Sequence, residues 1–193
     1  AQRLKVRSMV GLLPLCATTV IPEEFILRFP KAVEQARRFV QRNADLVPTI
    51  APPNKPGVKG RRLFAILDEK KLRRVLERML DEKRFLSPYG IRSLSRQHLE
   101  HPFIFHVHGE EYRVQYLPAE SNTGMFGGNS NWRGPVWMPV NGLIIRALLH
   151  FHLYYGDNFK IECPTGSGKL MNLFEVSREI ANRLAATFMR DEK

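Results

Sequence analysis

The stretch GGNSNWRGPVWMPVN, residues 127–141, gathers residue types that suit a carbohydrate ligand. It holds both tryptophans of the chain, Trp132 and Trp137, and it places Arg133 directly after the first. An indole ring offers a flat apolar face with an N–H edge, and a guanidinium offers a rigid fork of donors. Glycine and asparagine tolerate backbone conformations that let a loop approach a ligand closely. The pattern therefore predicts a sugar-binding loop.

A purely structural explanation exists for each of these residues taken singly. The tryptophans could belong to the core, Arg133 could pair with a buried carboxylate, and Pro135 could simply begin a helix. Their combination on one glycine-rich loop favours the ligand site. The loop also runs directly into an apolar helix predicted over Val136 to Tyr155, which would hold it rigidly.

The rest of the chain predicts mainly helices, with long loops and one hairpin. The apolar segment 6–20 predicts a buried helix that bends at Pro14. Further starts of helices are expected at Pro22, at Pro30, after Asp68 and after Asn172, and a β-hairpin over 103–117. Long helix pairs joined by aromatic-rich loops suit a helical toroid, but periodicity alone leaves an ordinary helical bundle open.

Composition is that of a globular protein of 193 residues, with 44% hydrophobic and 25% charged residues. No apolar run is long enough to span a bilayer and no signal peptide is recognisable, so a cytoplasmic location is expected. The net charge of +11 raises the possibility of a nucleic-acid surface. Much of the basic excess lies in 61–84, however, where acids alternate with it at helical spacing, so no specific nucleic-acid binding is expected.

Metal and phosphate chemistry find little support in the sequence. The two cysteines, Cys16 and Cys163, and the paired histidines lack the spacing of metal ligands, so neither a metal nor another cofactor is expected. The segment PTGSGK, residues 164–169, resembles a phosphate-binding loop, but Cys163 replaces its first glycine and Leu170 its hydroxyl residue. A glycine-rich turn is the better interpretation.

The quoted stretch resembles the W-R-G-P-[IV]-W-x-x-x-N signature of glycoside hydrolase family 63, which includes processing α-glucosidases and mannosylglycerate-hydrolase-like bacterial enzymes. FLSPYGIRSLS, residues 85–95, and the segment 154–176 resemble the family's flanking regions. The resemblance implies that residues 1–193 are the C-terminal part of an (α/α)6-barrel catalytic domain, with a loop and hairpin insertion at about 84–133. It also implies that the remainder of a longer polypeptide is a partner.

Enzymes of this family are inverting glycosidases, which need one carboxyl as general acid and another as general base. The resemblance implies that both lie outside this chain, and Glu120 is only a weak local candidate. It assigns substrate contacts to Trp132, Arg133, Gly134, Trp137 and Asn141, with Tyr89 and Arg92 on the same rim.

The expected function is thus a portion of an α-glucosidase or α-mannosidase that contacts an oligosaccharide or small glycoside. Because no complete carboxylate pair is found, we expect the chain alone to be inactive. A non-catalytic carbohydrate-binding or scaffold module is the alternative, and a basic nucleic-acid-binding domain is a weaker one. No membrane partner is expected.

Overall fold

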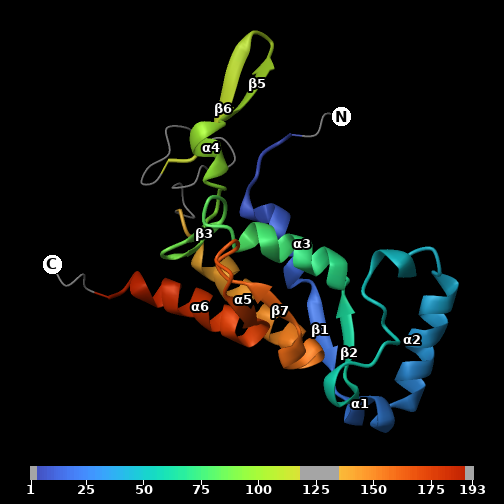
Figure 1. The fold of residues 1–193 in the computed structure, drawn as a ribbon. Coiled ribbons are helices and arrows are strands. Elements are labelled where there is room, and N and C mark those ends of the chain that lie inside the picture. The colour runs from blue at the N-terminus through green and yellow to red at the C-terminus, as the bar shows by residue number, and fades with distance from the viewer. Residues whose placement is uncertain (1–3, 118–134, 190–193) are drawn as a thin grey trace.

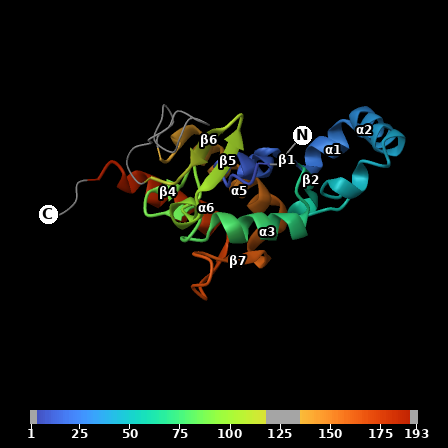
Figure 2. The same ribbon diagram turned by 90° about the horizontal axis from the view of Figure 1, so that it is seen from above.

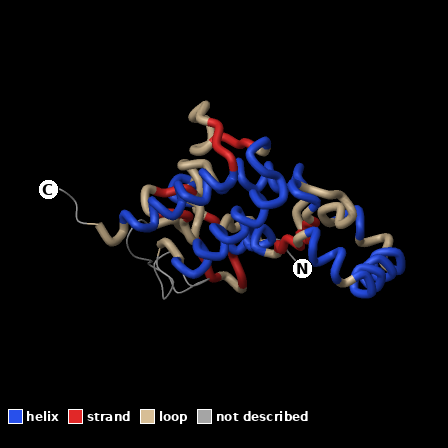
Figure 3. Tube along the Cα trace, turned by 90° about the horizontal axis from the view of Figure 1, so that it is seen from below, coloured by secondary structure: helices blue, strands red, loops and turns tan. Residues whose placement is uncertain are grey.

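The computed structural model describes residues 4–117 and 135–189, in which helices alternate with short strands (Figures 1 and 3). The α-helices are α1 Glu23–Arg28, α2 Pro30–Arg42, α3 Glu69–Met79, α4 Gln97–Glu100, α5 Met138–Tyr155 and α6 Leu173–Ala186. Short 3₁₀ helices are η1 Met9–Cys16, η2 Val47–Thr49, η3 Val58–Gly60 and η5 Gly156–Asn158. The strands are β1 Thr18–Ile21, β2 Arg62–Ala65, β3 Leu86–Ser87, β4 Gly90–Ile91, β5 Phe103–Val107, β6 Glu110–Val114, β7 Lys160–Glu162 and β8 Leu170–Asn172.

The strands pair only in twos, as β1–β2, β3–β4, β5–β6 and β7–β8, all antiparallel. Helix dominates over these small sheets, which agrees with a mainly α-helical chain. The described residues do not close into a barrel, so the expected (α/α)6 toroid is not seen in this part of the chain. Whether 84–133 is an insertion into such a domain stays a prediction.

The segment 6–20 is not one helix, and that prediction was wrong. It divides into the 3₁₀ helix η1, which contains Pro14, and the strand β1. Proline removes a backbone donor and clashes with the preceding turn, so the α-helical ladder cannot run through it. The following Thr-Thr-Val-Ile is entirely β-branched, and it pairs with β2 in the register Thr18↔Ala65 to Ile21↔Arg62.

Helix α5 forms the centre of the core because it is apolar on nearly every side. Ile144, Leu148 and Phe151 are all fully buried. Around them pack α6, β1 and η1, and α5 and α6 lie side by side (Figures 1 and 2). The helix predicted at Val136 begins at Met138, with Pro139 in its first turn.

Other sequence predictions are confirmed in detail. The Asp68 side chain accepts a hydrogen bond from the Lys71 amide at the start of α3. Asn172 and Glu175 form a reciprocal capping box at the start of α6. The hairpin β5–β6 turns at His108 and Gly109 and projects from the body of the molecule (Figure 1).

The glycine-rich segment 164–169 joins β7 to β8 and is therefore not a phosphate-binding loop, which would lead directly into a helix. It rests on the end of α3, where the Thr165 amide donates to the Leu80 carbonyl and the Thr165 hydroxyl donates to the Glu77 carbonyl. Burial, with a smaller contribution from Glu179, raises the pKa of the preceding Cys163 to about 11. That thiol stays protonated and is no nucleophile at neutral pH.

His98 connects the N-terminal segment to α4. The Arg7 amide donates to His98 Nε2 at 2.8 Å, and Nδ1 lies 3.0 Å from the His101 carbonyl, to which it must donate. The ring is therefore neutral, with both nitrogens occupied. Burial lowers its pKa below the ordinary 6.5, with Arg7 adding to the effect and the His101 bond opposing it.

This contact predicts a loss of stability in acid. Because the folded pKa lies below the unfolded one, the contribution of His98 is present above pH 6.5 and is lost as the pH falls through the folded value. We expect the free energy of unfolding of the wild type, relative to His98→Gln, to shrink as the pH falls from 7.5 to 5. Glutamine can donate and accept at the same two positions without titrating. The exposed His106, changed to Gln, is the control for a surface histidine, and an equal pH response for both variants would contradict the prediction.

Candidate functional site

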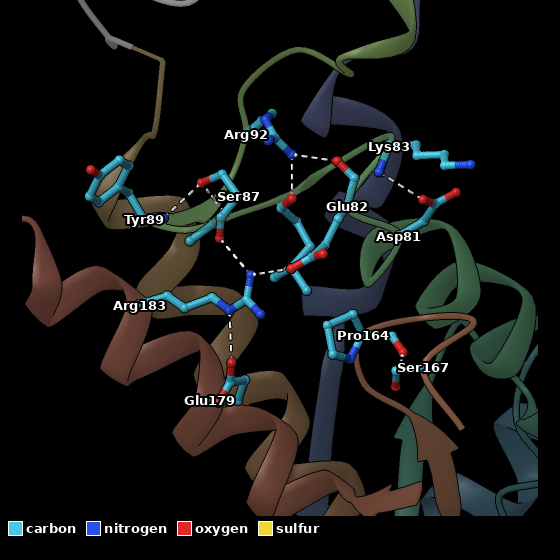
Figure 4. A network of polar contacts seen from close by, with 12 residues as sticks. Asp81, Glu82, Lys83, Ser87, Tyr89, Arg92, Pro164, Ser167, Glu179 and Arg183 are labelled. Carbon is cyan, nitrogen blue, oxygen red and sulfur yellow. Dashed lines mark hydrogen bonds and ion pairs between the residues drawn. The ribbon is translucent and has the colours of Figure 1, made fainter. Parts of the chain in front are cut away.

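The hairpin β3–β4 presents Tyr89 at its tip. Ser87 pairs with Gly90, so Pro88 and Tyr89 form a two-residue turn. The Ser87 hydroxyl donates to the Gly90 carbonyl at 2.7 Å and accepts from the Tyr89 amide at 3.0 Å. Tyr89 is half exposed while Ser87 is buried, so the turn is fixed from inside and leaves the tyrosine ring available to a ligand (Figure 4).

Gly90 allows α6 to pack against this hairpin. Its φ of +110° is one that side chains rarely adopt, and a Cβ there would lie 2.7 Å from Leu184 Cδ2 and 3.1 Å from Asn141 Oδ1. Only glycine fits both the backbone conformation and the space. The close approach brings the Tyr89 turn within reach of α5 and α6 together.

Asn141, on the first turns of α5, fastens that helix to β4. Its Oδ1 accepts from the Ile91 amide at 2.8 Å, and its Nδ2 donates to the carbonyls of Ile91 and Trp137, each at 3.0 Å. The side chain is fully buried. All of its hydrogen-bonding groups are thus occupied by backbone, which gives Asn141 a positioning role beside Trp137 and Tyr89.

Residues 92–93 connect the hairpin to the end of the tryptophan-containing stretch. Arg92 and Val136 form an antiparallel β-bridge, and the Ser93 amide donates to the Pro135 carbonyl at 2.9 Å. Segments more than 40 positions apart in sequence therefore lie side by side.

The Arg92 side chain is buried and binds the protein itself. Nε donates to the Tyr116 hydroxyl at 3.2 Å, and Nη1 donates to the carbonyls of Glu82 and Leu86 (Figure 4). The guanidinium also lies over the Tyr116 ring, 5.8 Å from its centroid. Arg92 thereby fixes the segment 82–93 against the base of the hairpin β5–β6.

Arg183, which the sequence reasoning missed, fastens the same segment to α6. Its Nε donates to Glu179 at 2.8 Å, and its Nη1 donates to Glu82 at 2.9 Å and to the Ser87 carbonyl at 3.0 Å (Figure 4). Burial alone would lower the pKa of Arg183, but the carboxylates of Glu179 and Glu82 have the larger combined effect and raise it. In sequence it resembled an ordinary i,i+4 partner of Glu179, and nothing signalled its reach to residue 87.

Of the residues predicted from sequence, the structure brings Tyr89, Arg92, Trp137 and Asn141 into one region. Trp137 directly precedes α5 and packs partly against the core. Trp132, Arg133, Gly134 and Glu120 lie outside the described residues. Contact of any of these side chains with a sugar stays a prediction.

A second feature, a groove of about 720 Å³, lies elsewhere, between the segment 6–12 and α3. Its lining includes five basic residues, Arg7, Lys71, Arg74, Arg78 and Arg84. Of the predicted sugar-binding residues that the structure describes, Tyr89, Arg92, Trp137 and Asn141, none lines it. Within the described ranges no cluster of histidine, cysteine and acidic side chains could hold a metal ion, and no helix there is long and apolar enough to cross a membrane.

Comparison with known proteins places this arrangement in a family. Residues 62–191 match the model of the mannosylglycerate hydrolase MGH1-like glycoside hydrolase domain, and the chain belongs to that family. It is also similar to a protein of Saccharomyces cerevisiae, Uncharacterized protein YMR196W, with 48% identity over 191 residues. That match covers 98% of this chain but 18% of the yeast protein. No solved structure matches significantly. The likeness to glycoside hydrolases is thus established, whereas membership of family 63 is not.

The Asn141 contacts predict a large effect of a small substitution. Asn141→Ala leaves the buried amide and carbonyl of Ile91 without these partners, and we expect the free energy of unfolding to fall by about 3 kcal/mol. Asn158→Ala is the control because it removes an exposed asparagine just beyond the C-terminal end of α5. It should change the free energy of unfolding by less than about 0.5 kcal/mol. Urea denaturation measures both. Equal stability of the two variants would show that the Asn141 contacts do not hold the hairpin.

Proposed function

We propose that this chain is part of an inverting glycosidase of the family 63 type, and that it supplies one wall of the subsite for an α-linked glucoside or mannoside. The observation that carries the proposal is the backbone pairing of residues 92–93 with 135–136. It puts the Tyr89 turn beside the end of the W-R-G-P-V-W stretch in a chain of a glycoside hydrolase family.

Each residue of the proposed wall has a role that its chemistry supports. Tyr89 is half exposed and can stack against the apolar face of a sugar ring. The resemblance assigned substrate contacts to Arg92 and Asn141 as well; because both are buried and bind the protein itself, we propose instead that they position the turn. Trp132, Arg133 and Trp137 would provide further stacking faces and donors, with Gly134 giving the loop room.

Hydrolysis with inversion needs a proton donor and a general base whose carboxyl groups stand about 6.5–9.5 Å apart. Near the Tyr89 turn, the structure uses Glu82 and Glu179 to bind Arg183. We therefore propose that the catalytic pair lies in other parts of a longer polypeptide, and that the isolated chain does not hydrolyse glycosides. Its two free cysteines suit a reducing compartment, which supports a cytoplasmic location.

The expected outcome is a selective loss of turnover in the complete polypeptide. Tyr89→Ala should lower kcat/KM for aryl α-glucosides or α-mannosides, or for mannosylglycerate, at least tenfold, equivalent to about 1.4 kcal/mol. Tyr112→Ala, a partly exposed tyrosine on the projecting hairpin, should leave kcat/KM unchanged. The chain of 193 residues alone should show no hydrolysis.

The same assays test the alternatives. Binding of these sugars by a complete polypeptide that never cleaves them would identify a carbohydrate-binding or scaffold module instead. Hydrolysis by the isolated chain, or equal activity of both tyrosine variants, would contradict the proposed wall. Tight oligonucleotide binding that weakens steeply with salt would favour the basic surface as the functional one.

A further inference from the structure

The pair α1 and α2 stands apart from the core (Figures 1 and 2). It carries large exposed apolar side chains. No residue of either helix is buried. Phe25 is 45% exposed, Leu27 76%, Phe29 41% and Phe39 65%. We call these four residues the α1–α2 apolar set. Three of them lie on the helices and Phe29 lies between the two helices. Scattered single exposed apolar residues are ordinary, whereas several large ones in one short stretch of chain make that stretch a candidate interaction surface.

The place of these helices in the topology makes the exposure unusual. Residues 22–61 connect β1 to β2, and those strands pair directly, Ile21 with Arg62. The helices thus form an excursion from a hairpin whose two ends meet. A 13-residue helix such as α2 gains most of its stability in water from packing its apolar face. Among the described elements, α2 packs chiefly against α1. Just before α2, the ring of Phe29 lies 4.6 Å from that of Phe25 on α1.

The length of the yeast relative indicates what could cover the set. The match spans 191 of the 193 residues, so it includes α1 and α2, yet it covers 18% of that protein. A homologous excursion therefore exists there within a chain about five times longer. The polar residues add a charge preference. On α2, Lys31, Arg37, Arg38 and Arg42 outnumber Glu34, a net charge of +3, and Glu23, Glu24 and Arg28 on α1 reduce this to +2 for the pair. The complementary surface is apolar with an acidic margin.

We propose that the α1–α2 apolar set docks on such a surface in another part of the same long polypeptide. Residues 22–61 would then attach this part of the chain to the part that carries the complementary surface. This attachment does not depend on the proposed glycosidase function. Because the docking would be intramolecular, the effective concentration of the partner surface would be high, and a small area of contact would suffice.

Hydrogen exchange tests the proposal on the complete polypeptide. We expect the amides of 23–42 to exchange at least tenfold more slowly there than in the isolated chain. Phe39→Ser should remove that difference, whereas Gln35→Ser, an exposed polar position of the same helix, should retain it. Amides of α5 should keep their protection in both variants, which shows that the fold survives.

Three outcomes would overturn the proposal. The first is equally fast exchange of 23–42 in the complete and the isolated chains. The second is a concentration-dependent dimer of the isolated chain that Phe39→Ser abolishes, which would make a second copy the occupant. The third is a native polypeptide no longer than this chain. Loss of glycosidase activity is not a readout, so failure of the proposed function leaves this test unaffected.

Discussion

One buried asparagine determines how the candidate site is assembled. Asn141 uses both halves of its amide on backbone groups, so the start of α5 and the strand β4 cannot move independently. A buried polar group without a hydrogen-bond partner would lower the stability of the fold. The Asn141 bonds therefore fix the orientation of β4 relative to α5 as well as stabilising the contact. The Tyr89 turn, the Arg92 bridge and the packing of Gly90 under α6 all follow from that fixed relation.

Side-chain hydrogen bonds, rather than a long β-sheet, hold the segment 82–93 in place. Within the segment 82–93, the strands β3 and β4 have two residues each. Besides the bonds to Asn141 and the pairing with 135–136, the segment is attached through Arg92, which lies within it, and through Arg183 from α6. Both guanidiniums bind backbone carbonyls, which fixes the path of the chain whatever side chains it carries. Arginine suits this task because its donors lie in a rigid plane.

The sequence supported predictions wherever a local rule applies. Asp68 and Asn172 predict the starts of helices because a short polar side chain can accept a hydrogen bond from the backbone N–H groups of the first turn. Alternation of apolar residues gave the hairpin β5–β6. The segment 6–20 misled because continuous apolar character suits a buried strand as well as a buried helix, and only the partner β2, more than 40 positions away, decides between them.

For the candidate site, the sequence named residues that the structure brings together, but whether they form a sugar site stays a prediction. Tyr89, Arg92, Trp137 and Asn141 meet in one region, but burial assigns Asn141 and Arg92 to support and leaves Tyr89 exposed. The two roles differ in how deeply each side chain is buried, and the hydrophobic pattern of the sequence does not give the burial of an individual polar residue. The contribution of Arg183 could not be predicted for a different reason: its bonds to Glu82 and Ser87 join residues about a hundred positions apart in the chain.

The excursion between β1 and β2 also bears on the order in which the chain folds. Pairing Ile21 with Arg62 closes a loop of 40 residues, and the entropy lost in such a closure must be offset before the two strands gain anything. Helices α5 and α6, by contrast, are separated by the smaller connection 156–172 and bury large side chains against each other. Local contacts form sooner than distant ones. The C-terminal helices would thus provide the nucleus on which the N-terminal strands condense, although the ribosome makes the N-terminal strands first.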